Sequence, residues 1–173
     1  MQKFNKYIKQ IYLPVVLILI LSFSRLIPHP WNFTPILAAG VFSGFYFKNF
    51  ILGSFIVVCS MFIADLFIGF HDTMFFTYIS LVAAVSFGIL IKNFKIFETI
   101  FAGLASSVSF FIITNFGSWL TLDMYEKNLS GLINSYILAI PFFHNTLLST
   151  LTYLFLLKII FDFSLKKKLL QSN

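Results

Sequence analysis

The sequence has little charge. Only 10% of its 173 residues are Asp, Glu, Lys or Arg, whereas 59% are hydrophobic. An ordinary water-soluble domain carries about 25% charged residues, which it needs to cover its surface. The composition therefore excludes a soluble globular domain and predicts an integral membrane protein, for which lipid is the solvent along most of the chain.

The sequence also has a single cysteine and lacks two common catalytic motifs. Cys59 alone cannot form a disulfide within the chain, and it lies well inside an apolar run, too deep to serve as a ligand at a loop. Neither GxxxxGK[ST], which would hold nucleotide phosphates, nor GxSxG, which would present a serine nucleophile, occurs. We therefore expect no enzyme activity and no cofactor.

Long apolar runs recur along almost the whole chain. About 20 such residues cross a bilayer as a helix, and the runs show no alternation typical of membrane β-strands. The predicted fold class is all-α, a polytopic membrane protein with one domain over residues 1–173. The six expected spans lie near residues 11–27, 31–47, 50–70, 74–91, 97–120 and 142–161. A signal peptide ending near Ser22 and Ser24 is the alternative interpretation of the first run.

The cations are distributed unevenly between the expected loops. Only Arg25 and Lys127 fall on one side of the predicted topology. The other side has Lys3, Lys6, Lys9, Lys48, Lys92, Lys95, Lys158, Lys166, Lys167 and Lys168. The positive-inside rule then places both termini in the cytoplasm. The net charge of +6 follows from this topology. It requires no nucleic-acid partner, although the lysines suit contact with anionic membrane lipid.

One acid lies within an apolar run. Asp65, in SMFIADLFIGF, is expected about 22 Å across a hydrocarbon core of about 30 Å. A bare carboxylate there costs several kcal/mol, so it should face the protein interior and have a partner. Arg25 is expected at a comparable depth and is the only arginine beside eleven lysines. We predict an Arg25–Asp65 pair; the alternative is an arginine that extends to the membrane surface.

Other polar side chains are expected at the same, outer level. In SRLIPHPWNFTP, Pro28 and Pro30 prevent the helix from continuing and make the connection rigid. The predicted substrate-binding residues are Arg25, His29, Asn32, Asp65, His71, Asn115, His144 and Asn145. Trp31 and Trp119 are expected either to stack on a ligand or to belong to an interfacial aromatic belt. The apolar segment 129–140 is too short to span, and we interpret it as a re-entrant or interfacial lid.

Four ordered motifs carry a resemblance to a known group. RLIPHPWNFTP, DLFIGFH followed by Tyr78, TNFGSWL and SYILAIPFFHNTLL, between about residues 20 and 155, resemble an uncharacterised family of small bacterial membrane proteins. That family is related to the substrate-binding S components of energy-coupling factor (ECF) transporters. The resemblance implies an S-component-like helix bundle that captures a vitamin or similar micronutrient on the outer side. Its implied partners are an energy-coupling membrane subunit and paired ATPases.

The sequence departs from S components in one feature. Their first helix commonly has small residues spaced by three for docking the coupling subunit, whereas IYLPVVLILILSFSR is bulky. The small pairs Gly40 with Gly44 and Gly103 with Ser107 lie in later spans, where we expect them to pack helices within the chain.

Two other functions are consistent with the sequence. In the first, a non-transporting structural membrane protein, the same polar residues would only hold helix ends together. In the second, the histidines and Asp65 or Asp72 would bind a divalent ion in a metal transporter or metal-dependent membrane enzyme. The histidines come from separate loops and show no ligand spacing such as i, i+4. We therefore predict no metal site.

Overall fold

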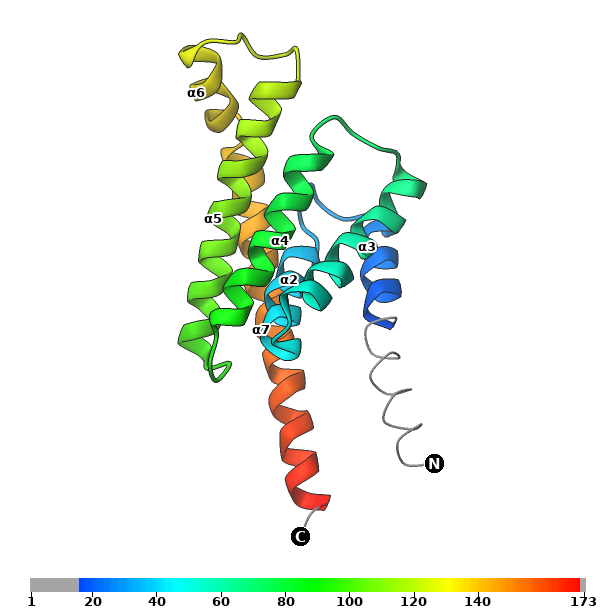
Figure 1. Cartoon of the computed structure of the whole chain (residues 1–173). Coiled ribbons are helices and arrows are strands. Elements are labelled where there is room, and N and C mark those ends of the chain that lie inside the picture. Colours follow the sequence, from blue (N-terminus) through cyan, green and yellow to red (C-terminus); the bar gives the residue numbers. More distant parts are fainter. Residues whose placement is uncertain (1–15, 172–173) are drawn as a thin grey trace.

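The described part of the chain folds entirely into helices joined by short connections, as predicted for an all-α protein. The computed structural model describes the backbone of residues 16–171 and the side chains of residues 16–163 (Figure 1). The helices are Val16–Leu26, α2 (Ile36–Phe47), α3 (Phe50–Ile68), α4 (Met74–Leu90), α5 (Ile96–Thr121), α6 (Leu129–Ile137) and α7 (Ile140–Gln171). The expected start of the first span, with Pro14 and the amino-terminal lysines, and most of the alternative signal peptide lie outside the described residues.

Three of these helices are long and apolar enough to cross a membrane, which supports assignment to a membrane protein. They are Phe50–Ile68, Ile96–Thr121 and the portion Ile140–Phe163 of α7. Val16–Leu26, Ile36–Phe47 and Met74–Leu90 are also apolar but shorter. A 12-residue helix such as α2 is only about 18 Å long, less than the hydrocarbon thickness of about 30 Å.

The second helix begins later than the span expected from residue 31. Residues 27–35 form an irregular connection, and Asn32 has a positive φ of 59°. Pro35 is the N-cap residue of α2, and its carbonyl accepts from the Ala39 N–H at 2.9 Å. The prolines restrict the residues before them to extended geometry, so the helix starts only after the last one.

Helices α2 and α4 cross in the centre of the molecule at two glycines. A Cβ added at Gly44 would lie 2.1 Å from the Val85 carbonyl oxygen, and one at Gly88 would lie 1.9 Å from the Val41 oxygen. The two backbones therefore touch, as they do where small residues line helix interfaces in membranes. Gly103 similarly meets side chains of α7, with Leu154 Cδ1 at 2.9 Å from an added Cβ. Gly44 and Gly103 thus pack helices within the chain, as predicted, and Gly88 does so as well, which was not predicted from the sequence.

The helix connections gather at two opposite ends of the bundle. At one end, Lys48 Nζ donates to the carbonyl oxygens of Ile89, at 2.9 Å, and Ile91. Phe94 is 1% exposed there and stacks on Phe45 with ring centroids 4.5 Å apart. The connections 27–35, 69–73 and 122–128 lie towards the other end, where α6 stands beside α5 (Figure 1). The candidate site is built at this second end.

Candidate functional site

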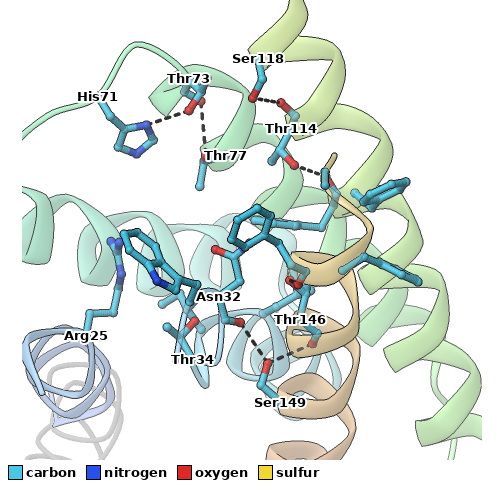
Figure 2. Close-up of a pocket in the computed structure, with 18 of the residues that line it drawn as sticks. Arg25, Asn32, Thr34, His71, Thr73, Thr77, Thr114, Ser118, Thr146 and Ser149 are labelled. Atoms are coloured by element: carbon cyan, nitrogen blue, oxygen red, sulfur yellow. Dashed lines mark hydrogen bonds between the residues drawn. The ribbon is translucent and has the colours of Figure 1, made fainter. Parts of the chain in front are cut away.

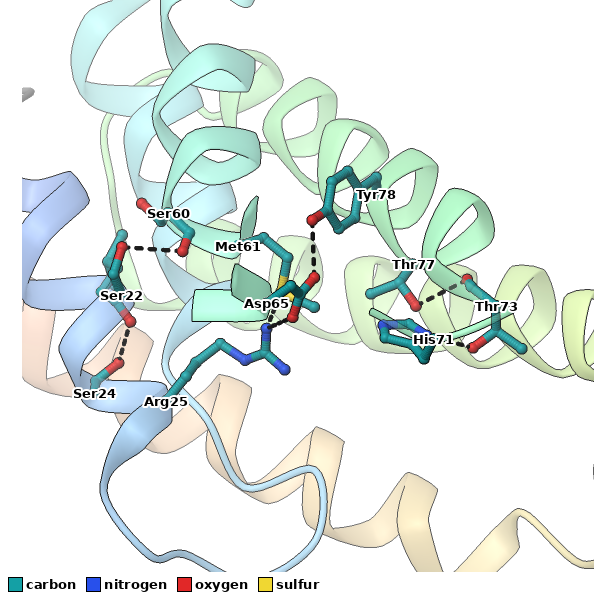
Figure 3. A network of polar contacts seen from close by, with 11 residues as sticks. Ser22, Ser24, Arg25, Ser60, Met61, Asp65, His71, Thr73, Thr77 and Tyr78 are labelled. Carbon is teal, nitrogen blue, oxygen red and sulfur yellow. Dashed lines mark hydrogen bonds and ion pairs between the residues drawn. The ribbon is translucent and has the colours of Figure 1, made fainter. Parts of the chain in front are cut away.

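The predicted Arg25–Asp65 pair forms and includes a third residue. Arg25 Nη1 lies 2.7 Å from Asp65 Oδ1, and the Tyr78 hydroxyl donates to Oδ2 at 2.8 Å (Figure 3). The Asp65 side chain is 1% exposed, and that of Arg25 is 16% exposed. Arg25 Nη1 also contacts Met61 Sδ at 2.6 Å. One carboxylate therefore joins the helix Val16–Leu26 to α3 and α4, with both oxygens bonded.

The first helix is held against α3 at a second point. The buried Ser22 hydroxyl contacts the Ser60 carbonyl oxygen at 3.0 Å and the Ile18 carbonyl oxygen of its own helix at 2.7 Å. This contact lies about one turn before Arg25. The helix that carries Arg25 is therefore fixed to α3 at two points, Ser22 and Arg25 itself.

The role of Tyr78 was not predicted from the sequence, where it appeared only as part of a motif. Tyr78→Phe is expected to lower the free energy of unfolding by about 1–3 kcal/mol, because it removes a hydrogen bond to a buried charge. Thermal melting in detergent measures this change. Tyr46→Phe is the matched control, since Tyr46 is 44% exposed. An equal effect of the two substitutions would contradict the role assigned to Tyr78.

A cavity of about 960 Å³ opens beside this pair. Five of the eight predicted site residues line it: Arg25, His29, Asn32, His71 and Asn115. Asp65 lies behind Arg25 and does not line the cavity. Neither His144, which is exposed, nor Asn145 is among the lining residues. Figure 2 shows Arg25 on one side of the cavity, facing the hydroxyl-bearing side chains of α4, α5 and α7.

The connection 27–35 is anchored to α7. Asn145 Nδ2 donates to the Trp31 carbonyl oxygen at 2.9 Å, and the Ser149 hydroxyl donates to the Asn32 carbonyl oxygen at 3.4 Å. Asn145 thus fixes the rim of the cavity without lining it. The Trp31 side chain lines the cavity while 79% exposed, whereas Trp119 Nε1 donates to the Glu126 carbonyl oxygen at 3.0 Å. Of the two tryptophans, Trp31 is the one that lines the cavity.

The two histidines that line the cavity have local partners. His29 Nδ1 lies 2.9 Å from the Pro30 carbonyl oxygen, and His71 Nδ1 lies 2.9 Å from Thr73 Oγ1. Within residues 16–163, no three side chains of His, Cys, Asp or Glu come together in a way that could hold a metal ion. The histidines therefore contribute separate polar groups to the rim.

Hydroxyl groups form much of the remaining polar lining, and the sequence did not single them out as a set. They belong to Thr34, Thr73, Thr77, Thr114, Ser118, Thr146, Ser149 and Thr150. Several donate to carbonyl oxygens of their own helix, for example Thr114 to Phe110 at 2.7 Å and Thr150 to Thr146 at 2.7 Å. Such bonds occupy the hydroxyl proton and leave the oxygen able to accept.

The segment interpreted as a lid is folded against α5. Asn128 is the N-cap residue of α6, and its side chain accepts a hydrogen bond from the Gly131 N–H at 2.9 Å. The Tyr136 hydroxyl donates to the Ile112 carbonyl oxygen at 2.9 Å. The cavity is lined by residues flanking α6, namely Met124, Tyr125, Leu138 and Ala139, and by none of its own. Movement of this segment stays a prediction.

Comparison with known proteins identifies one family. Residues 5–172 match a family of unknown function (DUF6580). The chain matches no curated protein and no solved structure.

Proposed function

The chain belongs to the DUF6580 family of unknown function, and from the geometry of its site we propose that it is a membrane-embedded binding protein for a small molecule. It would act as the substrate-capturing component of a micronutrient uptake system, in the manner of an ECF S component. The observation that carries this proposal is the cavity of about 960 Å³ with the only arginine of the chain in its wall. Ligand sites are typically cavities of about 300–1,000 Å³ with mostly apolar walls and a few placed polar groups.

The proposal includes six membrane passes with both termini in the cytoplasm. The three shorter apolar helices would complete three passes together with their flanking residues. Side chains of Lys48 and Lys158 lie at the end of the bundle opposite the cavity, each near the aromatic cluster around Phe94. Under the positive-inside rule that end would be cytoplasmic, and the cavity would open outward to capture substrate.

Energy coupling is a separate part of the proposal. In an S-component-like system the binder reorients with a coupling membrane subunit, and paired ATPases supply the energy. The small-residue faces of α2 and α5 are already occupied by α4 and α7. A coupling subunit would therefore dock on another of the apolar outer faces.

A structural role is the competing function, and one observation favours it. Both carboxylate oxygens of Asp65 are bonded, so the pair already locks three helices without a ligand. The two functions differ in whether they require the cavity. A structural clamp has no use for a large cavity with a few polar groups in its walls, whereas a binding protein requires one.

The proposed function is tested by native mass spectrometry of the detergent-purified protein, followed by identification of bound metabolites. We expect a co-purified small molecule in the wild type and its loss in Thr114→Trp, because the indole would fill part of the cavity that Thr114 lines. Val108→Trp is the matched control on the same helix, since Val108 is 43% exposed. Absence of any bound molecule in wild type, or equal retention by both variants, would contradict the proposal.

A further inference from the structure

The charges around the cavity indicate the chemical class of its ligand. The ionisable side chains in the described lining are Arg25, His29, His71 and Tyr125, and no acid or lysine is among them. The carboxylate paired with Arg25, that of Asp65, does not line the cavity and is 1% exposed (Figure 3). The groups that meet a ligand are therefore neutral or positive.

Arg25 has hydrogen-bonding capacity left over. Its contacts with Asp65 Oδ1 and Met61 Sδ both use Nη1. Within the described part of the chain, Nη2 and Nε make no hydrogen bond, and Figure 3 shows the second terminal nitrogen directed away from Asp65. A guanidinium presents five N–H donors in a fixed plane that matches a carboxylate or phosphate. Asp65 thus fixes one edge of the group and leaves another for an anion.

The opposite walls provide acceptors and aromatic surface. The hydroxyl protons of Thr77 and Thr146 are directed to carbonyl oxygens of their own helices, at 3.3 and 3.1 Å. Asn115 Nδ2 likewise donates to the Phe111 carbonyl oxygen at 2.7 Å, which leaves its amide oxygen as an acceptor. Phe110, Phe111, Phe142 and Phe143 line the same region. A ligand body with a planar ring and O–H or N–H donors would fit these walls.

From this arrangement we propose that the cavity binds an anionic amphipathic molecule, with its carboxylate or phosphate on Arg25 and an aromatic, donor-bearing body against α5 and α7. This inference rests on the proposed function and names the substrate class for the same site. An anionic lipid headgroup shares the chemistry of the anionic end, so the experiment separates a soluble metabolite from a lipid.

The test measures binding of matched acid and amide probes to the full chain in nanodiscs of zwitterionic phosphatidylcholine. The pairs are benzoate with benzamide, indole-3-acetate with indole-3-acetamide, and N-acetyltryptophan with its amide. Native mass spectrometry also records the charge class of any co-purified ligand. We expect acids to bind about tenfold or more tightly than their amides, as for a hydrogen bond to a charged group. A parallel set of nanodiscs containing phosphatidylglycerol shows whether an anionic lipid competes.

Three variants separate the effect of the Arg25 charge on acid binding from that of its planar shape. Asp65→Asn should strengthen acid binding, because the guanidinium loses its compensating carboxylate while an isosteric acceptor remains. The double variant Arg25→Gln/Asp65→Asn should abolish the preference for acids without leaving a buried unpaired charge. Arg25→Lys should weaken acid binding, because it keeps the charge but loses the planar donor edge.

The outcomes separate the two proposals. A preference for acids that disappears in the double variant supports an anionic ligand. If phosphatidylglycerol also weakens binding of the acid probes, the anionic ligand is a lipid headgroup. Equal binding of acids and amides, or a neutral or cationic co-purified ligand, overturns the inference but leaves the proposed function standing. If the wild type neither binds a probe nor retains a co-purified molecule, both the anionic ligand and the proposed binding function are overturned.

Discussion

Gly88→Ala is expected to prevent the protein from folding stably. The added methyl group would lie 1.9 Å from the Val41 carbonyl oxygen, and this neighbour is backbone that cannot rotate away. Helix α2 would have to move away from α4, which would separate the buried side chains between them. We expect a loss of more than about 4 kcal/mol, at the extreme of single substitutions. Gly44→Ala should act similarly, because its Cβ would lie 2.1 Å from the Val85 oxygen.

Gly40→Ala is the matched control on the same face of α2. Its added Cβ would lie 3.1 Å from Ala84 Cβ and 3.3 Å from the Leu81 oxygen, so a shift of a few tenths of an ångström can accommodate it. Thermal melting in detergent, with size-exclusion profiles to detect aggregation, compares the three variants. A Gly88→Ala variant that melted at the wild-type temperature would contradict the direct backbone contact between α2 and α4.

Arg25→Ala is expected to lower the free energy of unfolding by about 3–5 kcal/mol, because it leaves a buried carboxylate without its cation. Asp65→Ala should cost a similar amount by leaving the guanidinium unpaired. The double variant Arg25→Ala/Asp65→Ala should cost clearly less than the sum of the two single losses, since it leaves no buried charge without a partner. Unfolding by a denaturing detergent measures all four proteins of this cycle.

The exposed pair Lys158–Asp162 provides the control for this cycle. Its Nζ–Oδ2 distance of 2.8 Å resembles that of the buried pair, but the two side chains are 19% and 51% exposed. Asp162→Ala should therefore change stability by less than about 1 kcal/mol. Additive effects of the Arg25 and Asp65 substitutions, with no coupling between them, would show that the pair does not hold the helices together.

The sequence was sufficient to predict the helical class and the central ion pair. A carboxylate in an apolar helix needs a partner, and the chain offers only one arginine at a comparable depth. The prolines around His29 also predicted that the first helix would end there. These inferences depend on the cost of burying charge and on local backbone restriction, which a single sequence reveals.

Other features depend on how the helices are rotated and packed, which the sequence does not reveal. Tyr78 reaches Asp65 only because α4 turns that face towards α3. His144 was predicted as a site residue, yet its side chain is exposed on α7 and does not line the cavity. Its neighbour Asn145 instead donates to the Trp31 carbonyl oxygen at the rim of the cavity. Several of the cavity hydroxyls bond to their own helices, as serine and threonine do in many helices, so the sequence pattern did not show which of them line a common cavity.

The most direct test of the central claim is an experimental structure of the wild-type protein purified without added ligand and determined in a lipid nanodisc. The account predicts a cavity between Arg25, Thr114 and Thr146 that contains density for a compact small molecule or anionic headgroup in contact with the Arg25 guanidinium. A closed arrangement, in which side chains of α5 and α7 fill this space and Arg25 meets only Asp65 and Met61, would contradict it. The polar cluster would then be a structural clamp.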